Sequence, residues 1–139
     1  MSADLDANAE TRLRAAGLRP TRQRVALSRL LFQGAHRHIT AEALHDEAAN
    51  AGIGVSLATI YNTLHQFTGA GLLSQVIVDS SKTYFDTNVS SHYHFYHEDE
   101  GALIDIPCHD VAVEGLPDCR PDCSVARVDV IVRVRRKDQ

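Results

Sequence analysis

The 139-residue sequence predicts an α+β fold, with helices in the first half and strands in the second. Three residues suited to helix N-caps, Thr21, Thr40 and Ser56, each stand before apolar residues at helical spacing. Segments of alternating apolar and polar residues follow from position 72 onward, and this alternation is typical of strands with one buried face.

The first half contains three predicted helices in a fixed order. The first follows Thr21 and has apolar residues at positions 25, 27, 30 and 31. The second follows Thr40 and closes at Gly52, and the third follows Ser56 and closes at Gly69 and Gly71. The apolar stripe of the third helix is formed by Ile60, Leu64 and Phe67.

A hairpin is predicted directly after these helices. Residues 72–78 and 82–86 alternate around a polar turn at 79–81. The short glycine-bearing segment 51–55 suits the sharp turn between two helices of a helix-turn-helix. Three helices followed by a two-stranded wing predict a winged-helix DNA-binding domain over residues 1–86.

The second half, residues 87–139, is predicted to be a small α/β domain. Its strand candidates are 92–97, 102–106 and 125–134, and a loop rich in proline and cysteine separates the last two. Because two halves of roughly 70 residues are marginal alone, we expect this half to be a dimerisation domain.

The charge distribution favours a DNA-binding face in the first half. The chain has a net charge of -4, yet residues 1–40 contain seven arginines against three acidic residues. Arg19 and Arg22 are placed to reach phosphates or a minor groove. The polar face of the third helix carries Ala58, Tyr61, Asn62 and His65, which suit a major groove. From spacing alone, an ordinary amphipathic helix with a solvated face is the favoured explanation of these residues.

A second group of residues has the chemistry of metal ligands. His92 and His94 are two apart in a predicted strand, so their rings project from the same face. Asp86 and Asp105 can complete a site if the strands pair, and His38 would join from the first half. Such nitrogen and oxygen donors accept iron, manganese or zinc. The alternative is a histidine pair used only for packing.

These motifs resemble the ferric uptake regulator family. The segments 17–24 and 55–64 are similar to its N-terminal and recognition-helix patterns, and the resemblance covers nearly the whole chain. It implies a homodimer on an A/T-rich inverted repeat of double-stranded DNA, with Ser56 and Thr59 added to the DNA-binding residues. It also implies that the five residues that match the family's regulatory metal ligands bind an ion: His38, Asp86, His92, His94 and Asp105.

Other segments resemble the iron response regulator subgroup of that family. These are residues 104–107 and 126–137, together with His97 and Glu100 at positions where many relatives have a zinc-binding cysteine pair. The resemblance implies an iron-responsive regulator of haem-synthesis and iron-metabolism genes that loses activity through haem. His92 and His94 are then candidates for haem contact as well.

Several other interpretations stay open. A peroxide sensor, in which ferrous iron oxidises His38 or His92, is compatible with Asn62 and Asp105, and a classical metal-loaded repressor uses the same ligands. A metal-dependent hydrolase is disfavoured because five ligands leave little room for substrate, so we expect no enzyme activity. A metal-buffering protein without DNA is a further alternative.

The remaining chemistry-bearing residues form a possible second metal or redox site. They are Cys108, His109, Cys119 and Cys123. Unligated loop cysteines are the favoured interpretation. The sequence has no membrane-spanning apolar run and no signal-peptide pattern, and its three cysteines suit a reducing compartment, so we expect a cytoplasmic protein without a membrane partner.

Overall fold

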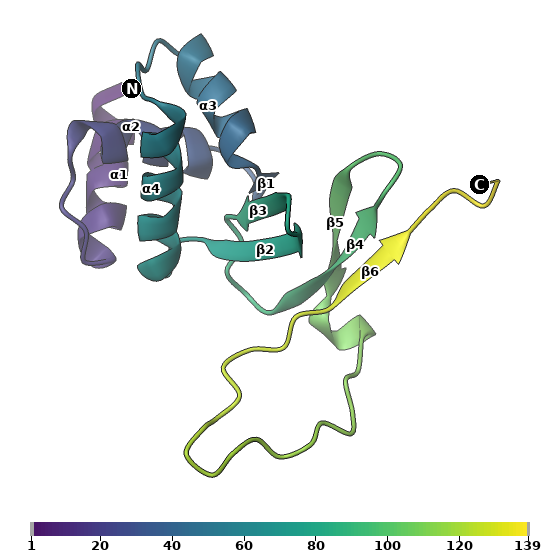
Figure 1. The fold of residues 1–139 in the computed structure, drawn as a ribbon. Helices are drawn as coiled ribbons and strands as arrows, with labels where there is room; N and C mark the ends of the chain where they lie inside the picture. Colours follow the sequence, from purple (N-terminus) through teal and green to yellow (C-terminus); the bar gives the residue numbers. More distant parts are fainter. Residues whose placement is uncertain (1, 139) are drawn as a thin grey trace. The chain divides into compact units, whose positions relative to one another are not determined.

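The computed structural model describes residues 2–138 and divides into two compact units after Val89 (Figure 1). The first unit contains four helices and three strands: α1 (Ser2–Ala15), α2 (Arg22–Phe32), β1 (His38–Ile39), α3 (Ala41–Asn50), α4 (Leu57–Gly69), β2 (Ser74–Asp79) and β3 (Lys82–Asp86). The second contains β4 (His92–His97), β5 (Ala102–Pro107), the 3₁₀ turn η1 (Cys108–Asp110) and β6 (Ile131–Val134). The helices of residues 2–138 are all too short or too polar to cross a lipid bilayer.

The three predicted helices are confirmed, and each begins at the predicted cap. The side chains of Thr21, Thr40 and Ser56 accept hydrogen bonds from backbone N–H groups in the first turns of α2, α3 and α4. The predicted stripe of α4 is fully buried. Together with apolar side chains from the other helices and from β3, it forms one core. The largest fully buried side chains of this core are Leu13, Leu27, Leu31, Leu44, Ile60, Leu64, Phe67 and Phe85.

Helix α1 was not among the three predicted helices, and the prediction has to be corrected. Its apolar positions form a stripe of only three residues four apart, Leu5, Ala9 and Leu13, in a mostly polar segment. Leu13 is nevertheless fully buried, and Arg29 of α2 donates to Asp6 of α1 over 2.9 Å. Tertiary packing against α2 therefore stabilises a helix that local sequence only weakly predicts.

The predicted hairpin is confirmed and gains a third strand. The sheet has the order β1-β3-β2, and all its pairings are antiparallel. Asp79 closes the turn by accepting hydrogen bonds from the Ser81 backbone and hydroxyl. The short strand β1 pairs His38 with Asp86 and Ile39 with Phe85. This pairing joins the segment before α3 to the end of the hairpin.

The second unit is a sheet of order β5-β4-β6, in which β6 runs parallel to β4. The strand predicted over 125–134 is shorter than expected, because only residues 131–134 are strand. The physical reason is the length of its partner. His94 pairs with Ile131 and β4 begins at His92, so residues 125–128 have no β4 residue opposite them.

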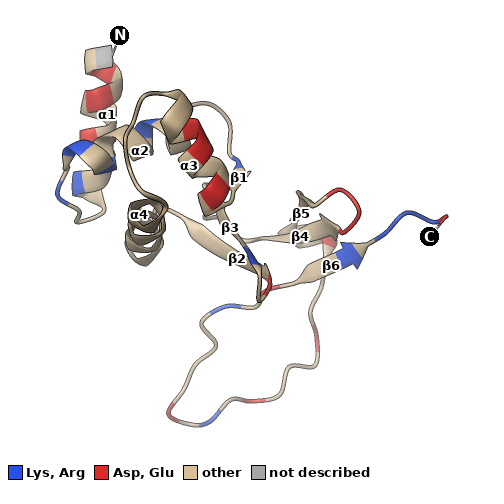
Figure 2. Ribbon diagram, turned by 45° about the horizontal axis from the view of Figure 1, so that its top comes forward, with Lys and Arg blue, Asp and Glu red and all other residues tan. Residues whose placement is uncertain are grey.

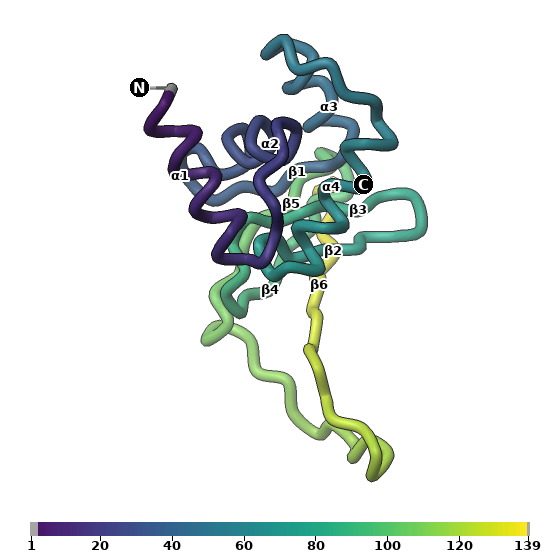
Figure 3. The backbone as a smooth tube through the Cα atoms, turned by 90° about the vertical axis from the view of Figure 1, so that its left-hand side faces the viewer, coloured from purple at the N-terminus to yellow at the C-terminus, as the bar shows by residue number. Residues whose placement is uncertain are grey.

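A long loop, residues 111–130, connects η1 to β6 and extends from the strands of the second unit (Figure 3). Of the four alternating valines, Val128 and Val130 therefore lie in the loop, and Val132 and Val134 lie in β6. The sequence predicts a small α/β domain here. Within residues 90–138, however, the one helical element is the 3₁₀ turn η1.

One buried hydroxyl gives a test of the core. Ser28 of α2 is fully buried, and its Oγ atom has no hydrogen-bond partner in the described part of the chain. Because an unsatisfied buried hydroxyl is costly, Ser28→Ala is expected to raise the free energy of unfolding by about 1 kcal/mol. Urea denaturation measures this change. Ser56→Ala is the matched control and should lower stability by about 1 kcal/mol, since it removes a helix cap. Equal destabilisation by both variants would contradict the assignment.

Candidate metal centre and nucleic-acid interface

The first group of predicted ligands is a histidine–aspartate pair in the first unit. The antiparallel register of β1 and β3 puts His38 opposite Asp86, with 3.2 Å between Nε2 and Oδ2. Asp86 is 1% exposed, and its Oδ1 accepts a hydrogen bond from the Asn88 backbone over 2.9 Å. Because a buried carboxylate is costly without charged or hydrogen-bonding partners, this fixed side chain is suited to hold a cation.

The second group lies in the second unit, on one face of the β4–β5 pair. His94 pairs in register with Asp105, and the Nε2 atoms of His92 and His94 are each 3.5 Å from its Oδ1. The Nδ1 atom of His92 lies 2.7 Å from the Ser90 carbonyl oxygen. A carbonyl only accepts, so Nδ1 carries the proton and the neutral ring has its lone pair on Nε2. The backbone thereby presets His92 as an Nε2 ligand.

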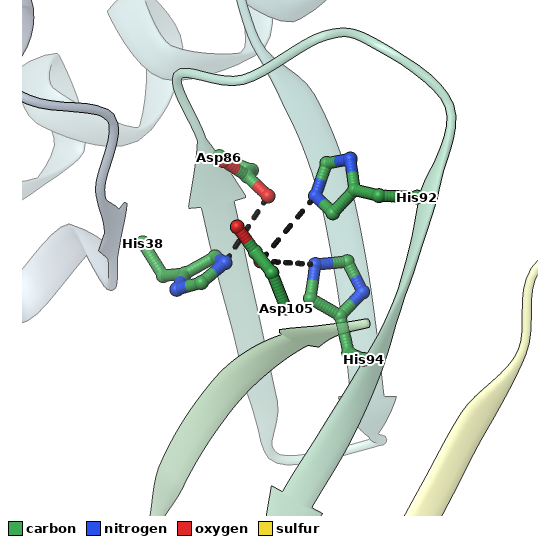
Figure 4. Close-up of side chains that lie close together, drawn as sticks. All are labelled: His38, Asp86, His92, His94 and Asp105. Atoms are coloured by element: carbon green, nitrogen blue, oxygen red, sulfur yellow. Dashed lines mark ion pairs between the residues drawn. The ribbon is translucent and has the colours of Figure 1, made fainter. Parts of the chain in front are cut away.

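The donor chemistry of both groups fits a divalent metal ion. Figure 4 shows the two groups, with dashed lines for the ion pairs within each. Three imidazole nitrogens and two carboxylates are donors that iron, manganese and zinc accept, and no thiolate is present to select a softer metal. Within each unit, the structure brings the predicted ligands together.

The predicted DNA-reading face of α4 is exposed. Ala58, Asn62 and His65 are exposed, and Tyr61 keeps 36% of its surface accessible. Ser56 and Thr59 bond to one another at the helix start, so their hydroxyls serve the cap. Arg19 and Arg22 are exposed at the start of α2, in a region rich in basic residues (Figure 2).

Glu42 of α3 contacts this face, and it is not among the residues that the sequence predicts for it. The Tyr61 hydroxyl donates a hydrogen bond to its carboxylate. That hydrogen bond, with slight burial and the charge of Glu42, raises the pKa of Tyr61 above its usual value. On the other side, the Tyr61 ring stacks on His65 at 6.4 Å between ring centres, and His65 contacts Phe85 edge-on at 5.7 Å. A path of side chains therefore connects the reading face to the residue next to Asp86.

The Glu42–Tyr61 bond predicts a change in a titration. Since the raised pKa reflects the bond to an ionised acceptor, the bond is present below the usual tyrosine pKa and is lost as pH rises through the raised value. Glu42→Gln is expected to lower the pKa of Tyr61 toward 10.0. Ultraviolet absorbance follows tyrosinate formation, with Tyr61→Phe as the subtraction. Glu47→Gln on the same helix is the control, because Glu47 pairs with Arg37. An unchanged titration in Glu42→Gln would refute the assignment.

A polar groove of about 650 Å³ in the first unit borders both predicted sites. The residues that line it include His38, Thr40, Glu42, Tyr61 and Lys82. A predicted metal ligand and a predicted DNA-reading residue thus line the same groove of the first unit.

Comparison with known proteins places the chain in a family. Residues 15–119 match the sequence profile of the Ferric uptake regulator family, which is most of the chain. The chain belongs to the ferric uptake regulator (Fur) family. The resemblance drawn from the sequence motifs is therefore confirmed at the level of the family.

Individual relatives of this Fur-family chain include repressors and solved regulators. It is 37% identical over 93 residues to the peroxide-responsive repressor PerR of Staphylococcus aureus, covering 67% of this chain and 62% of that protein. It thus spans less than two thirds of the length of this curated relative. The ferric uptake regulator of Pseudomonas aeruginosa with manganese has 26% identity and a TM-score of 0.70, with 93% of this chain and 98% of that chain covered. That of Vibrio cholerae has 22% identity and a TM-score of 0.71, with 91% and 98% covered, and shares the fold.

The Fur-family chain does not assemble the second metal site considered from the sequence. All three cysteines are unpaired and exposed, and in the described residues Cys108, His109, Cys119 and Cys123 form no group of three or more convergent donors. The favoured interpretation, unligated loop cysteines, stays a prediction. The sequence alone could not decide it, because the connecting loop has no periodic pattern.

Proposed function

We propose that this chain is a metal-responsive transcription regulator that binds double-stranded DNA as a homodimer. The observation that carries the proposal is the contact between His38 and Asp86, two of the proposed metal ligands, in the same unit as the proposed DNA-reading helix α4. The second ligand group belongs to the other unit. The protein is proposed to act in the cytoplasm and to have no enzyme activity.

We propose that one divalent ion binds both ligand groups. Asp86 and His92 are six residues apart, so the chain between them spans at most about 20 Å and keeps the two groups in reach of each other. When bound, the ion supplies a positive charge that attracts both groups. The residues of the chain do the rest: Ser90 orients His92, and the Asn88 backbone N–H orients Asp86.

The proposed regulation acts through the arrangement of the two units. Binding at both groups favours one arrangement over others, and a dimer then presents its two α4 helices at one spacing. Within the first unit, the contacts from Phe85 through His65 to Tyr61 couple β3 to the reading face. Arg19 and Arg22 would contact phosphates, and Tyr61 and Asn62 would reach base edges of an A/T-rich inverted repeat.

The homodimer is proposed to form through the second unit. Phe95 pairs in register with Ile104 of β5 and Val132 of β6, so the three side chains lie side by side on one face of the sheet. They are 38%, 49% and 37% exposed. A contiguous apolar row on an open sheet is typical of an association surface, and a second copy supplies a matching row.

Within this function we propose the iron response type. The support is the sequence resemblance of residues 104–107 and 126–137, and the regulated genes would be those of haem synthesis and iron metabolism. His92 and His94 are the proposed haem contacts. In this type haem weakens DNA binding, and iron or manganese is the expected ion, with zinc as an alternative.

A peroxide-sensing repressor is the second candidate, and a specific observation favours it. The similarity to staphylococcal PerR proteins extends over 93 residues at 37% identity. Asp105, His38 and His92 occupy the ligand positions that this alternative requires. The discriminating result is one added oxygen on His38 or His92, found by mass spectrometry after peroxide treatment of the iron-loaded protein.

Operator binding tests the proposed function. A duplex carrying an A/T-rich inverted repeat, selected from a random pool, is labelled and titrated with apo, manganese-loaded and haem-treated protein in a fluorescence anisotropy assay. Manganese is expected to change the affinity by about 5- to 150-fold, and haem is expected to weaken it. Equal affinity for the selected and a scrambled duplex would refute the DNA-binding function. Tighter binding with haem would refute the iron response type.

A further inference from the structure

The loop between η1 and β6 carries two cysteines at a turn, Cys119 just before it and Cys123 at its end. The backbone N–H of Cys123 donates to the Arg120 carbonyl over 2.9 Å, which closes a turn across residues 120–123. The Cys119 thiol in turn donates to the Cys123 carbonyl oxygen over 3.1 Å. The turn therefore folds the first cysteine directly against the second.

An ion pair lies within this turn. The Arg120 guanidinium donates two hydrogen bonds to the Asp122 carboxylate, at 3.0 and 2.6 Å. The Cys123 thiol also donates to this carboxylate, over 3.5 Å. These hydrogen bonds, with that of Arg120 the strongest, lower the pKa of Asp122 below its usual value. The Asp122 carboxylate, in the same way, raises the pKa of Arg120. The pair therefore links two side chains of the turn across its exposed surface.

Both sulfurs are accessible to small molecules. Cys119 and Cys123 are exposed. Cys108 is exposed as well but lies in η1, next to β5 and before the long loop. The chain thus has one neighbouring pair of thiols on the turn and one separate thiol, which serves as an internal reference.

We propose that Cys119 and Cys123 are a redox-active dithiol that a hydroperoxide converts into an intramolecular disulfide. Rotation of the Cys119 side chain moves its sulfur from the carbonyl oxygen of residue 123 to the sulfur of the same residue. A disulfide needs a sulfur–sulfur bond of about 2.05 Å between nearby backbones. The turn supplies that proximity without a change in the sheet.

The reaction balances with hydrogen peroxide as the oxidant. One thiolate attacks a peroxide oxygen, the oxygen–oxygen bond breaks, and a sulfenic acid and one water form. The second thiolate attacks the sulfenic sulfur, the sulfur–oxygen bond breaks, and a second water leaves with the remaining proton. The two thiols lose two protons and two electrons in total, and the peroxide takes up both and leaves as two waters. A small dithiol reverses the reaction by exchange.

Thiol counting on the full chain tests the proposal. Metal is first removed with a chelator, so that oxidation of histidine by bound iron does not contribute and the result is independent of the proposed DNA and metal functions. The untreated chain has three free thiols. Equimolar hydrogen peroxide is expected to pair two of them, so that one free thiol is left. The intact mass should fall by two hydrogens, and dithiothreitol should restore both values.

Matched variants decide which cysteines react. Cys108→Ser is expected to keep the loss of two thiols at an unchanged rate. Cys119→Ser and Cys123→Ser should show no two-hydrogen loss, because a sulfenic acid on the remaining loop thiol has no neighbouring thiol to attack it. Oxygen addition without pairing, a crosslink between two chains, or a disulfide that includes Cys108 would each overturn the proposal.

A second measurement uses no oxidant. Phenylarsine oxide forms two sulfur–arsenic bonds with neighbouring thiols, and its oxygen leaves as water with both thiol protons. One equivalent is expected to bind the unmodified chain and Cys108→Ser, and to resist competition by a monothiol. Equal retention by Cys119→Ser would overturn the assignment of the dithiol.

Discussion

Replacing His94 with alanine is expected to abolish the response of operator binding to manganese. His94 is buried, and its Nε2 lies 3.5 Å from Asp105 Oδ1. Removal of a ligand should lower metal affinity by at least about 100-fold, since loss of a group that only orients a ligand already costs about 10- to 100-fold. Isothermal titration with manganese measures the affinity, and fluorescence anisotropy measures the response of DNA binding.

The control for this prediction is His97→Ala. His97 lies on the same strand, three residues further along, where alternation points its side chain to the other face of the sheet. It should leave manganese affinity unchanged. Circular dichroism should show both variants folded. If His94→Ala retained the manganese response, or His97→Ala lost it equally, the proposed metal centre would be wrong.

The second large effect is expected from Phe95→Glu, which should convert the proposed dimer to a monomer. Phe95 is the middle residue of the apolar row on β4, β5 and β6. In a twofold interface the substitution introduces a charge from each copy, and burial of an unpaired charge is strongly unfavourable. The dimer dissociation constant is expected to rise at least about 100-fold, with a matching loss of operator affinity because each monomer reads one half-site.

Analytical ultracentrifugation gives the mass of the species in solution. Leu116→Glu is the matched control, because Leu116 is an equally apolar residue, 55% exposed, in the loop of the same unit. That variant should stay dimeric. A dimer that survives Phe95→Glu at micromolar concentration would show that another surface joins the two copies.

Three of the helices could be predicted from the sequence, whereas helix α1 and strand β1 could not. Thr21, Thr40 and Ser56 predicted their helices correctly because an N-cap acts within three residues of its own position. Helix α1 escaped prediction because its stability depends on Leu13 and Asp6 contacting α2. The strand β1 has two residues, too few for any periodic pattern, and exists because β3 pairs with it.

The candidate site shows the same division. Residue type and two-residue spacing indicated His92 and His94, since strand alternation alone puts them on one face. Nothing local indicated that Ser90 fixes the His92 tautomer, that Glu42 accepts from Tyr61, or that Cys119 folds onto Cys123. Each of these depends on the path of a turn or on contact between helices.

By itself, the sequence determined the helix caps, the apolar stripe of α4, the hairpin, the ligand types and the family, because these follow from local stereochemistry and from motifs along the chain. The tertiary structure decided which of these residues meet: His38 with Asp86, His94 with Asp105, and Phe95 with Ile104 and Val132. The physical reason is that strand register is set by pairing between distant segments, and a one-residue slip would turn each ligand to the opposite face.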